Sequence, residues 1–326
     1  MSHWRDLARS SSGCAQDAAY ATFVSGDKYV PGAMCLRRSL SASGNRCPMD
    51  IIFDDRTPER NLSSKSWQLL VNAYGSERLF PLSKIMAAHP SSVADMQYSA
   101  PTPRHRAGRG LFERGVEHMA THAKLWLWGL PRSRLVVLDS DMVVRGPLDW
   151  LTTLELRDRE VAAVTVQRRS QSFFNSGLIA FRPGAEVLHN LTRIALLARS
   201  GAVPDDRREE GGGIVKTGEK IFGDQSLLNF YFRGRVRSLP VSTMAVAPAR
   251  VGVDPAHVMA TDPAVVHWLS EPKPWCRPSL NVQETQAIGP GPGLSERRPL
   301  HASSQAQLWW DMCRDKVSDV PVQMLG

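Results

Sequence analysis

The chain has 326 residues, with 42% hydrophobic and 22% charged side chains, which is the composition of an ordinary globular protein. A chain of this length and composition can bury a hydrophobic core without stabilising disulfides or metal ions. It is long enough for one large α/β domain or two small ones. The formal net charge is +8, but the arginines are spread along the chain, so the charge indicates a solvated surface and gives little support to nucleic-acid binding.

No run approaches about 20 apolar residues, so we expect no membrane span. The cysteines are odd in number, widely spaced and without a Cys-x-x-Cys pair; they are Cys14, Cys35, Cys47, Cys276 and Cys313. This pattern argues against a disulfide framework or a zinc site, and so predicts a reducing compartment. The N-terminus lacks an apolar signal core, which makes the cytoplasm the expected location. The Golgi lumen is the alternative if an anchor precedes this chain.

The first 82 residues show a β-α-β-α-β pattern. Residues 1–18 are polar and small and are expected to form a loose lead-in. The predicted strands cover 19–24, 49–53 and 78–82, and the predicted helices between them cover 29–40 and 60–73. This order implies a parallel sheet with right-handed crossovers, and therefore an α/β fold.

The rest of the chain continues with helices, strands and two long loops. The predicted helices cover 113–130, 185–199, 223–232 and 306–313, and the predicted strands cover 135–138, 161–166, 178–181, 236–239 and 264–267. Residues 173–177 are interpreted as a turn, and Asp224 as the N-cap of its helix. The predicted loops are 87–112 and 201–219; a loop as long as the first is usually functional or disordered.

Two carboxylates follow the apolar strand at 135–138, in the sequence Asp139-Ser140-Asp141. Carboxylates one residue apart at a strand end can lean toward one point, as a hard divalent cation requires. Ligand sites in α/β sheets lie beyond the carboxyl ends of the strands. Alone, this spacing is more often a solvated turn or a helix cap, and the apolar strand before it shifts the interpretation toward a site.

Four segments then combine in a fixed order. They are Ala-Thr-Phe-Val-Ser at 21–25 with Tyr-Val-Pro-Gly at 29–32; 124–141, ending in Asp-Ser-Asp; Phe-Asn-Ser-Gly at 174–177 with Gly-Asp-Gln-Ser-Leu-Leu-Asn at 223–229; and Val-His-Trp-Leu at 266–269 with Lys-Pro-Trp at 273–275. Together they resemble glycosyltransferase family 8, on the side of glycogenin, galactinol synthase and plant xylan glucuronyltransferases. The resemblance covers about residues 19–276 and also touches Leu308-Trp309-Trp310-Asp311. The order and spacing of the four segments are far more specific than any one segment.

The resemblance implies a GT-A fold, in which helices flank a Rossmann-like, mostly parallel central sheet. It divides the chain into a flexible lead-in at 1–18, a GT-A domain at 19–276 and a Pro/Gly-rich tail with a short helix at 277–326. It further implies a nucleotide-sugar donor, usually a UDP-sugar, a Mn²⁺ ion (Mg²⁺ is possible) and retention of the anomeric configuration. No nucleic-acid partner is expected, and a homodimer is left open.

Carried onto this chain, the resemblance makes Asp139, Asp141 and His267 the metal ligands. Asp224, Gln225 and Lys124 are the implied catalytic residues. The implied donor-binding residues are Phe23, Ser25 and Tyr29 around the uracil and ribose, Asn175 and Ser176 at the sugar, Lys273 at the diphosphate, Lys124 at the phosphate or the sugar, and Ser140 between the two aspartates. Taken singly, these residues have structural interpretations: a core histidine, solvated lysines, a core phenylalanine, a turn and a helix cap.

Three departures from the family pattern bear on specificity. Gly26 stands where glycogenins usually have Asn, and Ser270 replaces a small Gly near the phosphates. The stretch 168–173 lacks the acidic residue usually found before Phe-Asn-Ser-Gly. Because that segment faces the acceptor in relatives, the acceptor is left unassigned.

The expected function is retaining transfer of a hexosyl-type sugar from a UDP-sugar to a separate sugar, polyol or glycan acceptor. A self-glycosylating, glycogenin-like primer is an alternative, but no tyrosine follows Tyr231. A catalytically weak carbohydrate-binding or scaffolding protein is a second alternative, and a metal-dependent nucleotidyltransferase is a rival enzyme class. The residue types make chemical sense for transfer, because positive groups stabilise a leaving diphosphate and a carboxylate stabilises an oxocarbenium-like sugar.

Overall fold

The structure is a computed structural model. It describes residues 4–9, 13–58, 60–95, 122–168, 171–199, 203–204, 214–215, 223–247, 262–268 and 273–276, together with Trp309 and Cys313.

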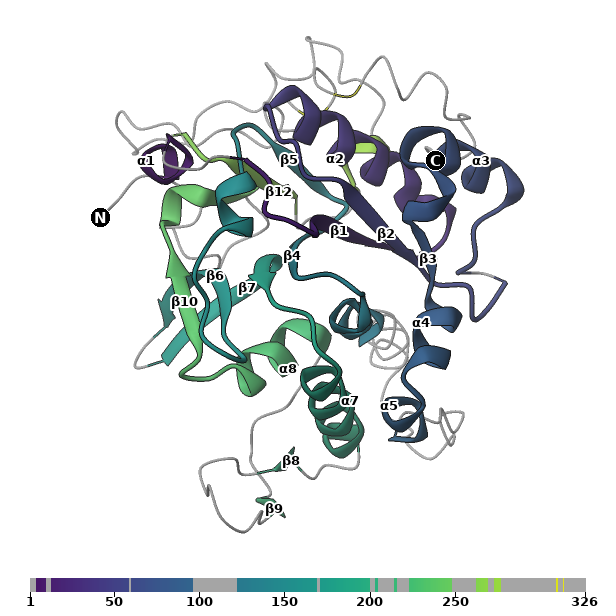
Figure 1. Cartoon of the computed structure of the whole chain (residues 1–326), viewed down its shortest axis with the longest axis vertical. Coiled ribbons are helices and arrows are strands. Elements are labelled where there is room, and N and C mark those ends of the chain that lie inside the picture. The colour runs from purple at the N-terminus through teal and green to yellow at the C-terminus, as the bar shows by residue number, and fades with distance from the viewer. Residues whose placement is uncertain are drawn as a thin grey trace, which may run out of the picture.

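A seven-stranded sheet forms the centre of the molecule, with the order β10-β6-β7-β4-β1-β2-β3 (Figure 1). Its strands are β1 (Ala18–Val24), β2 (Met49–Phe53), β3 (Leu79–Pro81), β4 (Arg134–Leu138), β6 (Val161–Arg168), β7 (Gln171–Phe181) and β10 (Val236–Leu239). β7 runs antiparallel to both of its neighbours, β4 and β6, and the other pairings are parallel. The sheet is therefore mostly parallel, as the sequence predicted.

Helices cover both faces of this sheet (Figure 1). Along β4, Val136 and Leu138 pack in a cluster with α2 (Val30–Ala42), while Leu135 and Val137 pack on the opposite side. The elements packed on that opposite side include α4 (Leu82–Ala88), η3 (His122–Gly129), α7 (Ala185–Arg199) and α8 (Gly223–Tyr231). A strand buried on both faces has no polar side, which explains the uninterrupted apolar run.

The remaining elements frame this core. They are α3 (Ser64–Tyr74), which packs on α2, α5 (Pro90–Asp95), which packs on α7, and the short η1 (Asp27–Tyr29), η2 (Ser76–Arg78), η4 (Asp149–Thr152), η5 (Val241–Thr243) and η6 (Pro274–Cys276). Within the loop predicted at 201–219, β8 (Val203–Pro204) pairs with β9 (Ile214–Val215).

A second, three-stranded sheet has the order β11-β12-β5. It consists of β5 (Met142–Val144), β11 (Met244–Ala247) and β12 (Val265–Trp268). β12 runs parallel to β11 and antiparallel to β5. The sequence did not predict β5 or β11, because each is a short apolar segment that becomes a strand only by pairing with β12.

Several predicted boundaries need correction. The lead-in is not wholly loose, since α1 (Trp4–Arg9) buries Trp4, whose Nε1 donates to the Asp262 carbonyl over 2.8 Å. Residues 173–177 belong to the continuous strand β7 and are not a turn. Of the helix predicted at 113–130, residues 113–121 lie outside the described part, and 122–129 form a 3-10 helix. Trp309 and Cys313, inside the last predicted helix, are both helical.

Four of the five cysteines form disulfides, Cys14–Cys47 and Cys35–Cys313, so the prediction of unpaired cysteines is wrong. Their sequence separations, 33 and 278 residues, carry no recognisable framework pattern. Because disulfides are typical of oxidising compartments, the cysteines no longer support a reducing one. Within the described residues, no helix is both long enough and apolar enough to span a bilayer.

Asp149 provides a test of the packing at the amino ends of the strands. Its carboxylate accepts from the Tyr20 hydroxyl over 2.7 Å, and from the backbone N–H groups of Arg46 and Cys47 over 2.8 and 3.4 Å. Asp149→Ala should lower the free energy of unfolding by about 3 kcal/mol, because buried donors lose their acceptor. Urea denaturation measures this loss. Asp158→Ala, at a side chain that is 93% exposed, is the control and should change stability little; equal losses would contradict the assignment.

Candidate functional site

The acidic pair lies at the carboxyl end of β4. Asp139 directly follows this buried strand, and its N–H donates to the Gly177 carbonyl of β7 over 2.9 Å. The chain then turns into β5, and the N–H of Met142 donates back to the Asp139 carbonyl over 3.2 Å. Asp139 is thus fixed by the main sheet, while Asp141 stands at the start of the second sheet.

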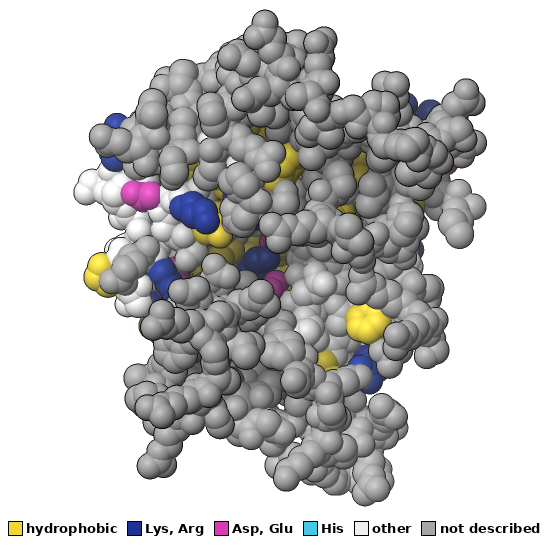
Figure 2. Space-filling model, turned by 180° about the vertical axis from the view of Figure 1, so that it is seen from behind, with side chains coloured by type: hydrophobic (Ala, Val, Ile, Leu, Met, Phe, Trp, Pro, Cys, Tyr) yellow, Lys and Arg dark blue, Asp and Glu magenta, His cyan; other side chains and the backbone are white. Residues whose placement is uncertain are grey.

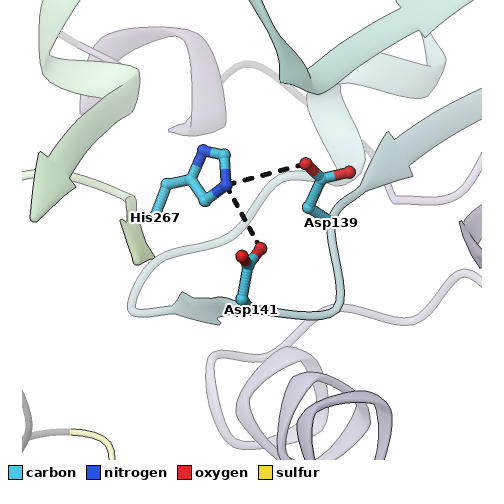
Figure 3. A group of neighbouring side chains, drawn as sticks. All are labelled: Asp139, Asp141 and His267. Atoms are coloured by element: carbon cyan, nitrogen blue, oxygen red, sulfur yellow. Dashed lines mark ion pairs between the residues drawn. The ribbon is translucent and has the colours of Figure 1, made fainter. Parts of the chain in front are cut away.

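Pairing of β5 with β12 brings in the third residue. His267 stands opposite Met142 in the register, and the N–H of Trp268 donates to the Asp141 carbonyl over 2.9 Å. Nε2 of His267 lies 3.2 Å from Oδ1 of Asp141 and 3.6 Å from Oδ2 of Asp139 (Figure 3). The imidazole therefore points between the two carboxylates, although it lies more than 120 residues away in sequence.

This group fits a divalent metal ion. One ligand atom from each of Asp139, Asp141 and His267 lies within 4.8 Å of the others. Oδ1 of Asp141 is buried, and Nε2 of His267 lies 3.2 Å from it, so these two atoms can ligate the same ion. Two carboxylate oxygens with one imidazole form a ligand set that suits a divalent cation.

Gly177 makes room for the histidine. A Cβ at this position would lie 2.5 Å from Cε1 and 2.7 Å from Nδ1 of His267. The Phe-Asn-Ser-Gly segment therefore requires glycine here for close packing rather than for a turn.

Two lysines neutralise the acidic pair. Lys124 Nζ lies 2.6 Å from Oδ1 of Asp139 and 3.4 Å from Oδ2 of Asp224. Lys273 Nζ donates to Oδ2 of Asp141 over 2.7 Å. Both ammonium groups therefore offset the negative charge of the carboxylates. Charged side chains of both signs also meet near the centre of the face shown in Figure 2.

The ionisation of these groups follows from their neighbours. Burial raises the pKa of the Asp141 carboxyl, but His267 and Lys273 outweigh burial and hold that pKa well below its usual range. Burial raises the pKa of Asp139 despite the opposing charge of Lys124. Burial alone would lower the pKa of Lys124, yet the charges of Asp139 and Asp224 raise it. Lys124 is therefore a fixed cation and not a general base.

Asp224 forms a second acidic position beside the first. It is the second residue of α8, so it is not the N-cap that the sequence predicted. The Ser176 hydroxyl donates to its Oδ2 over 2.9 Å. Burial raises the pKa of Asp224, but the charge of Lys124 and the Ser176 hydrogen bond outweigh this and lower it, which keeps the carboxyl ionised.

The contact between β7 and α8 holds these residues in register. Asn229 accepts from the Phe174 N–H and donates to the Phe174 carbonyl, each over 2.8 Å. Oε1 of the exposed Gln225 accepts from the Ser176 N–H over 3.4 Å. Oδ1 of Asn175 accepts from the Gly177 N–H over 2.8 Å, so this side chain shapes the segment itself.

The residues assigned to the nucleotide lie at the same edge of the sheet. Phe23 and Ser25 are half-buried at the end of β1, which neighbours β4, and Tyr29 follows in η1. Gly26 has φ 76° and ψ 175°, a backbone conformation essentially confined to glycine, which gives a physical reason for this departure from the family pattern.

Ser140 and Trp275 meet α2 at Gly32. Ser140 is buried, and a Cβ on Gly32 would lie 2.5 Å from its carbonyl oxygen and 2.7 Å from Cη2 of Trp275. Sequence reasoning did not assign a role to either Gly32 or Trp275. The Lys-Pro-Trp signature was the available signal, but only the fold shows that its tryptophan contacts α2.

Solved structures with similar folds are glycosyltransferases by name. The galactosyltransferase LgtC, solved with donor and acceptor sugar analogs, matches with a TM-score of 0.52 and 15% identity over 91% of this chain and 95% of its own. The fold is that of a GT-A glycosyltransferase. Glycosyltransferase GlyE of Streptococcus pneumoniae TIGR4 matches with a TM-score of 0.50 and 16% identity, over 94% of this chain and 63% of its own.

Sequence comparison adds two curated relatives of this GT-A protein. Glycogenin of Komagataella phaffii is 27% identical over 222 residues, and glycosyltransferase GlyF of Streptococcus pneumoniae serotype 4 is 26% identical over 152 residues. The chain spans less than half of each, 44% and 34%. No family profile matches. The predicted resemblance to family 8 is confirmed, through glycogenin, and so is the predicted α/β GT-A fold.

Removal of one carboxylate tests the metal group. Asp141→Asn should weaken Mn²⁺ binding roughly 100-fold, because a charged oxygen ligand is lost while the side chain keeps its shape. Isothermal titration calorimetry measures the affinity, and circular dichroism checks the fold. Asp158→Asn, at an exposed carboxylate, is the matched control. An unchanged Mn²⁺ affinity in Asp141→Asn would place the metal elsewhere.

Proposed function

We propose that this protein is a retaining glycosyltransferase. It transfers a hexosyl-type sugar from a UDP-sugar to a separate sugar, polyol or glycan acceptor, with Mn²⁺ as the metal and Mg²⁺ as a possible substitute. One observation carries this proposal: Asp139, Asp141 and His267 converge beside the Lys124–Asp224 pair at the carboxyl edge of a GT-A sheet. Both halves of a sugar-transfer site, one for phosphate and one for sugar, are thereby in contact.

The phosphate half would hold the donor diphosphate. Asp139, Asp141 and His267 are the ligands for the divalent ion, which, when bound, supplies Lewis-acid charge at the diphosphate. Lys273 and Lys124 add fixed positive charge where negative charge develops as the sugar–phosphate bond breaks. Since both lysines are largely buried, little solvent screens these charges.

The sugar half centres on Asp224. Its carboxylate is ionised and faces the same lysine as the metal group. It can stabilise the positive charge of an oxocarbenium-like sugar, or attack the anomeric carbon to form a covalent intermediate. Either role requires the ionised form, which Lys124 and Ser176 maintain. Gln225, which follows Asp224 in α8, and Asn175, which precedes Ser176 in β7, would complete the sugar pocket.

The tyrosines favour a separate acceptor over self-glycosylation. Tyr231 is 6% exposed and stacks edge-on against Phe232, with ring centroids 4.7 Å apart. Tyr20 is fully buried, and the hydroxyl of Tyr74 donates to the Ala33 carbonyl inside the helix layer. Tyr98 lies outside the described residues. The homodimer that the sequence left open stays untested.

A donor screen tests the proposal. The protein is incubated with Mn²⁺ and UDP-glucose, UDP-galactose, UDP-glucuronate, UDP-xylose or UDP-N-acetylglucosamine, with EDTA as the control. We expect Mn²⁺-dependent release of UDP from at least one donor and no added sugar mass on the intact protein. A ladder of hexose masses would instead identify a self-glycosylating primer. Pyrophosphate release from a nucleoside triphosphate would indicate the nucleotidyltransferase, and sugar binding without turnover the binding protein.

Replacement of the second carboxylate separates catalysis from donor binding. Asp224→Asn should lower the turnover rate about 100-fold or more and change UDP affinity less than about twofold, because the lost charge acts in the transition state. Steady-state rates and calorimetry with UDP measure the two effects. Asp17→Asn, at an exposed carboxylate before β1, is the control. A mutant with the normal rate would leave Asp224 with a purely structural role.

A further inference from the structure

A small cluster of buried side chains lies apart from the main core, beside the phosphate half of the site. It consists of Cys35, Val143, Trp275, Trp309 and Cys313, with Tyr29 packed against it. Cys35 comes from α2 and Val143 from β5, while Trp309 and Cys313 come from the C-terminal part of the chain. None of these five is among the residues assigned to the site above.

Several contacts fix the position of Trp275 in this cluster. Its Nε1 donates to the Lys28 carbonyl over 2.9 Å, and its ring lies edge-on to Tyr29 at 6.4 Å between centroids. A Cβ on Gly32 would lie 2.7 Å from Cη2, so the ring sits directly on the backbone of α2. The Trp309 ring lies 5.7 Å away and provides another packing contact.

Lys273 depends on this arrangement because it precedes Trp275 by only two residues. Two residues span at most about 7 Å, so the anchored tryptophan limits where the lysine can go. Lys273 is 7% exposed and donates to Asp141 over 2.7 Å and to the Trp268 carbonyl over 3.4 Å. A buried ammonium group is stabilised only while its partners stay in reach.

The Cys35–Cys313 disulfide holds Trp309 next to Trp275. Both Trp309 and Cys313 are helical, and a spacing of four residues is the one that places two side chains on the same face of a helix. The bond from Cys313 to Cys35 fastens this segment to α2 across a separation of 278 residues. Without it, docking of a segment so far along the chain must overcome the loss of its conformational freedom.

We propose that Trp309, fastened by the Cys35–Cys313 disulfide, is a positioning residue of the donor site. It presses Trp275 onto α2 and thereby keeps Lys273 at Asp141, where the donor diphosphate binds. This inference rests on the proposed function. We call Trp309 and the Cys35–Cys313 disulfide the C-terminal clamp.

The second disulfide provides a matched control. Cys14 and Cys47 precede β1 and β2, so their bond lies at the amino ends of the strands, while the donor site lies at the carboxyl ends. Removal of either disulfide lowers stability through the unfolded state. Only removal of the C-terminal clamp should also change the affinity for UDP.

The experiment measures UDP affinity by calorimetry in the presence of Mn²⁺, alongside thermal unfolding. We expect Trp309→Ala and Cys313→Ser to weaken UDP binding about tenfold, which corresponds to about 1.4 kcal/mol. Trp309→Phe should restore most of the affinity, because an aromatic ring still packs on Trp275. The double variant Cys14→Ser and Cys47→Ser should bind UDP normally even if it unfolds at a lower temperature.

Reduction of the Cys35–Cys313 disulfide in the already folded protein gives a second measurement. In the double variant that lacks Cys14 and Cys47, dithiothreitol converts the remaining sulfur–sulfur bond to two thiols and is itself oxidised to a cyclic disulfide. UDP affinity should fall while the far-ultraviolet circular dichroism is unchanged. Normal UDP affinity in Trp309→Ala, Cys313→Ser and the reduced protein would overturn the C-terminal clamp alone. Absence of UDP binding by the wild-type protein would overturn the proposed function and the clamp with it.

Discussion

The antiparallel pairing of β5 with β12 is the constraint on which the site depends. It places His267 opposite Met142, one residue beyond Asp141, and the Trp268 N–H on the Asp141 carbonyl closes the arrangement. Every residue of these two strands is buried, so a slip of one position would turn His267 away from the carboxylates. The backbone pairing of β5 with β12 therefore fixes the geometry of the candidate metal ligands.

The same region concentrates charge that the core would otherwise exclude. Asp139, Asp141 and Asp224 lie close together, and Lys124 and Lys273 balance them. Burying such groups costs free energy that their mutual attraction only partly offsets. The proposed role in binding a divalent ion and a diphosphate would explain why the chain keeps these charges, since preorganised charge is most effective where water is excluded.

α2 acts as a common support for the phosphate half of the site. Through Gly32 it admits both the backbone of Ser140 and the ring of Trp275, and through Cys35 it binds the C-terminal segment. Any side chain at position 32 would clash with both neighbours, because a Cβ there would lie 2.5 Å from the Ser140 carbonyl oxygen and 2.7 Å from Cη2 of Trp275. The acidic loop, the lysine segment and the C-terminal clamp therefore share one rigid surface.

The sequence by itself determined the α/β class, most element positions and the residues of the candidate site. Periodicity placed the 49–53 strand and the 185–199 helix at their observed bounds, because these signals are local. The four ordered segments predicted Asp139, Asp141 and His267 as one group.

The tertiary structure alone decided the features that depend on pairing between segments far apart in the sequence. It joined Cys14 to Cys47 and Cys35 to Cys313, formed β5 and β11, extended β7 through the expected turn, and gave Asp224 a lysine partner. Residue type and spacing report what a segment prefers, whereas contacts across 278 residues are set only when the chain closes on itself.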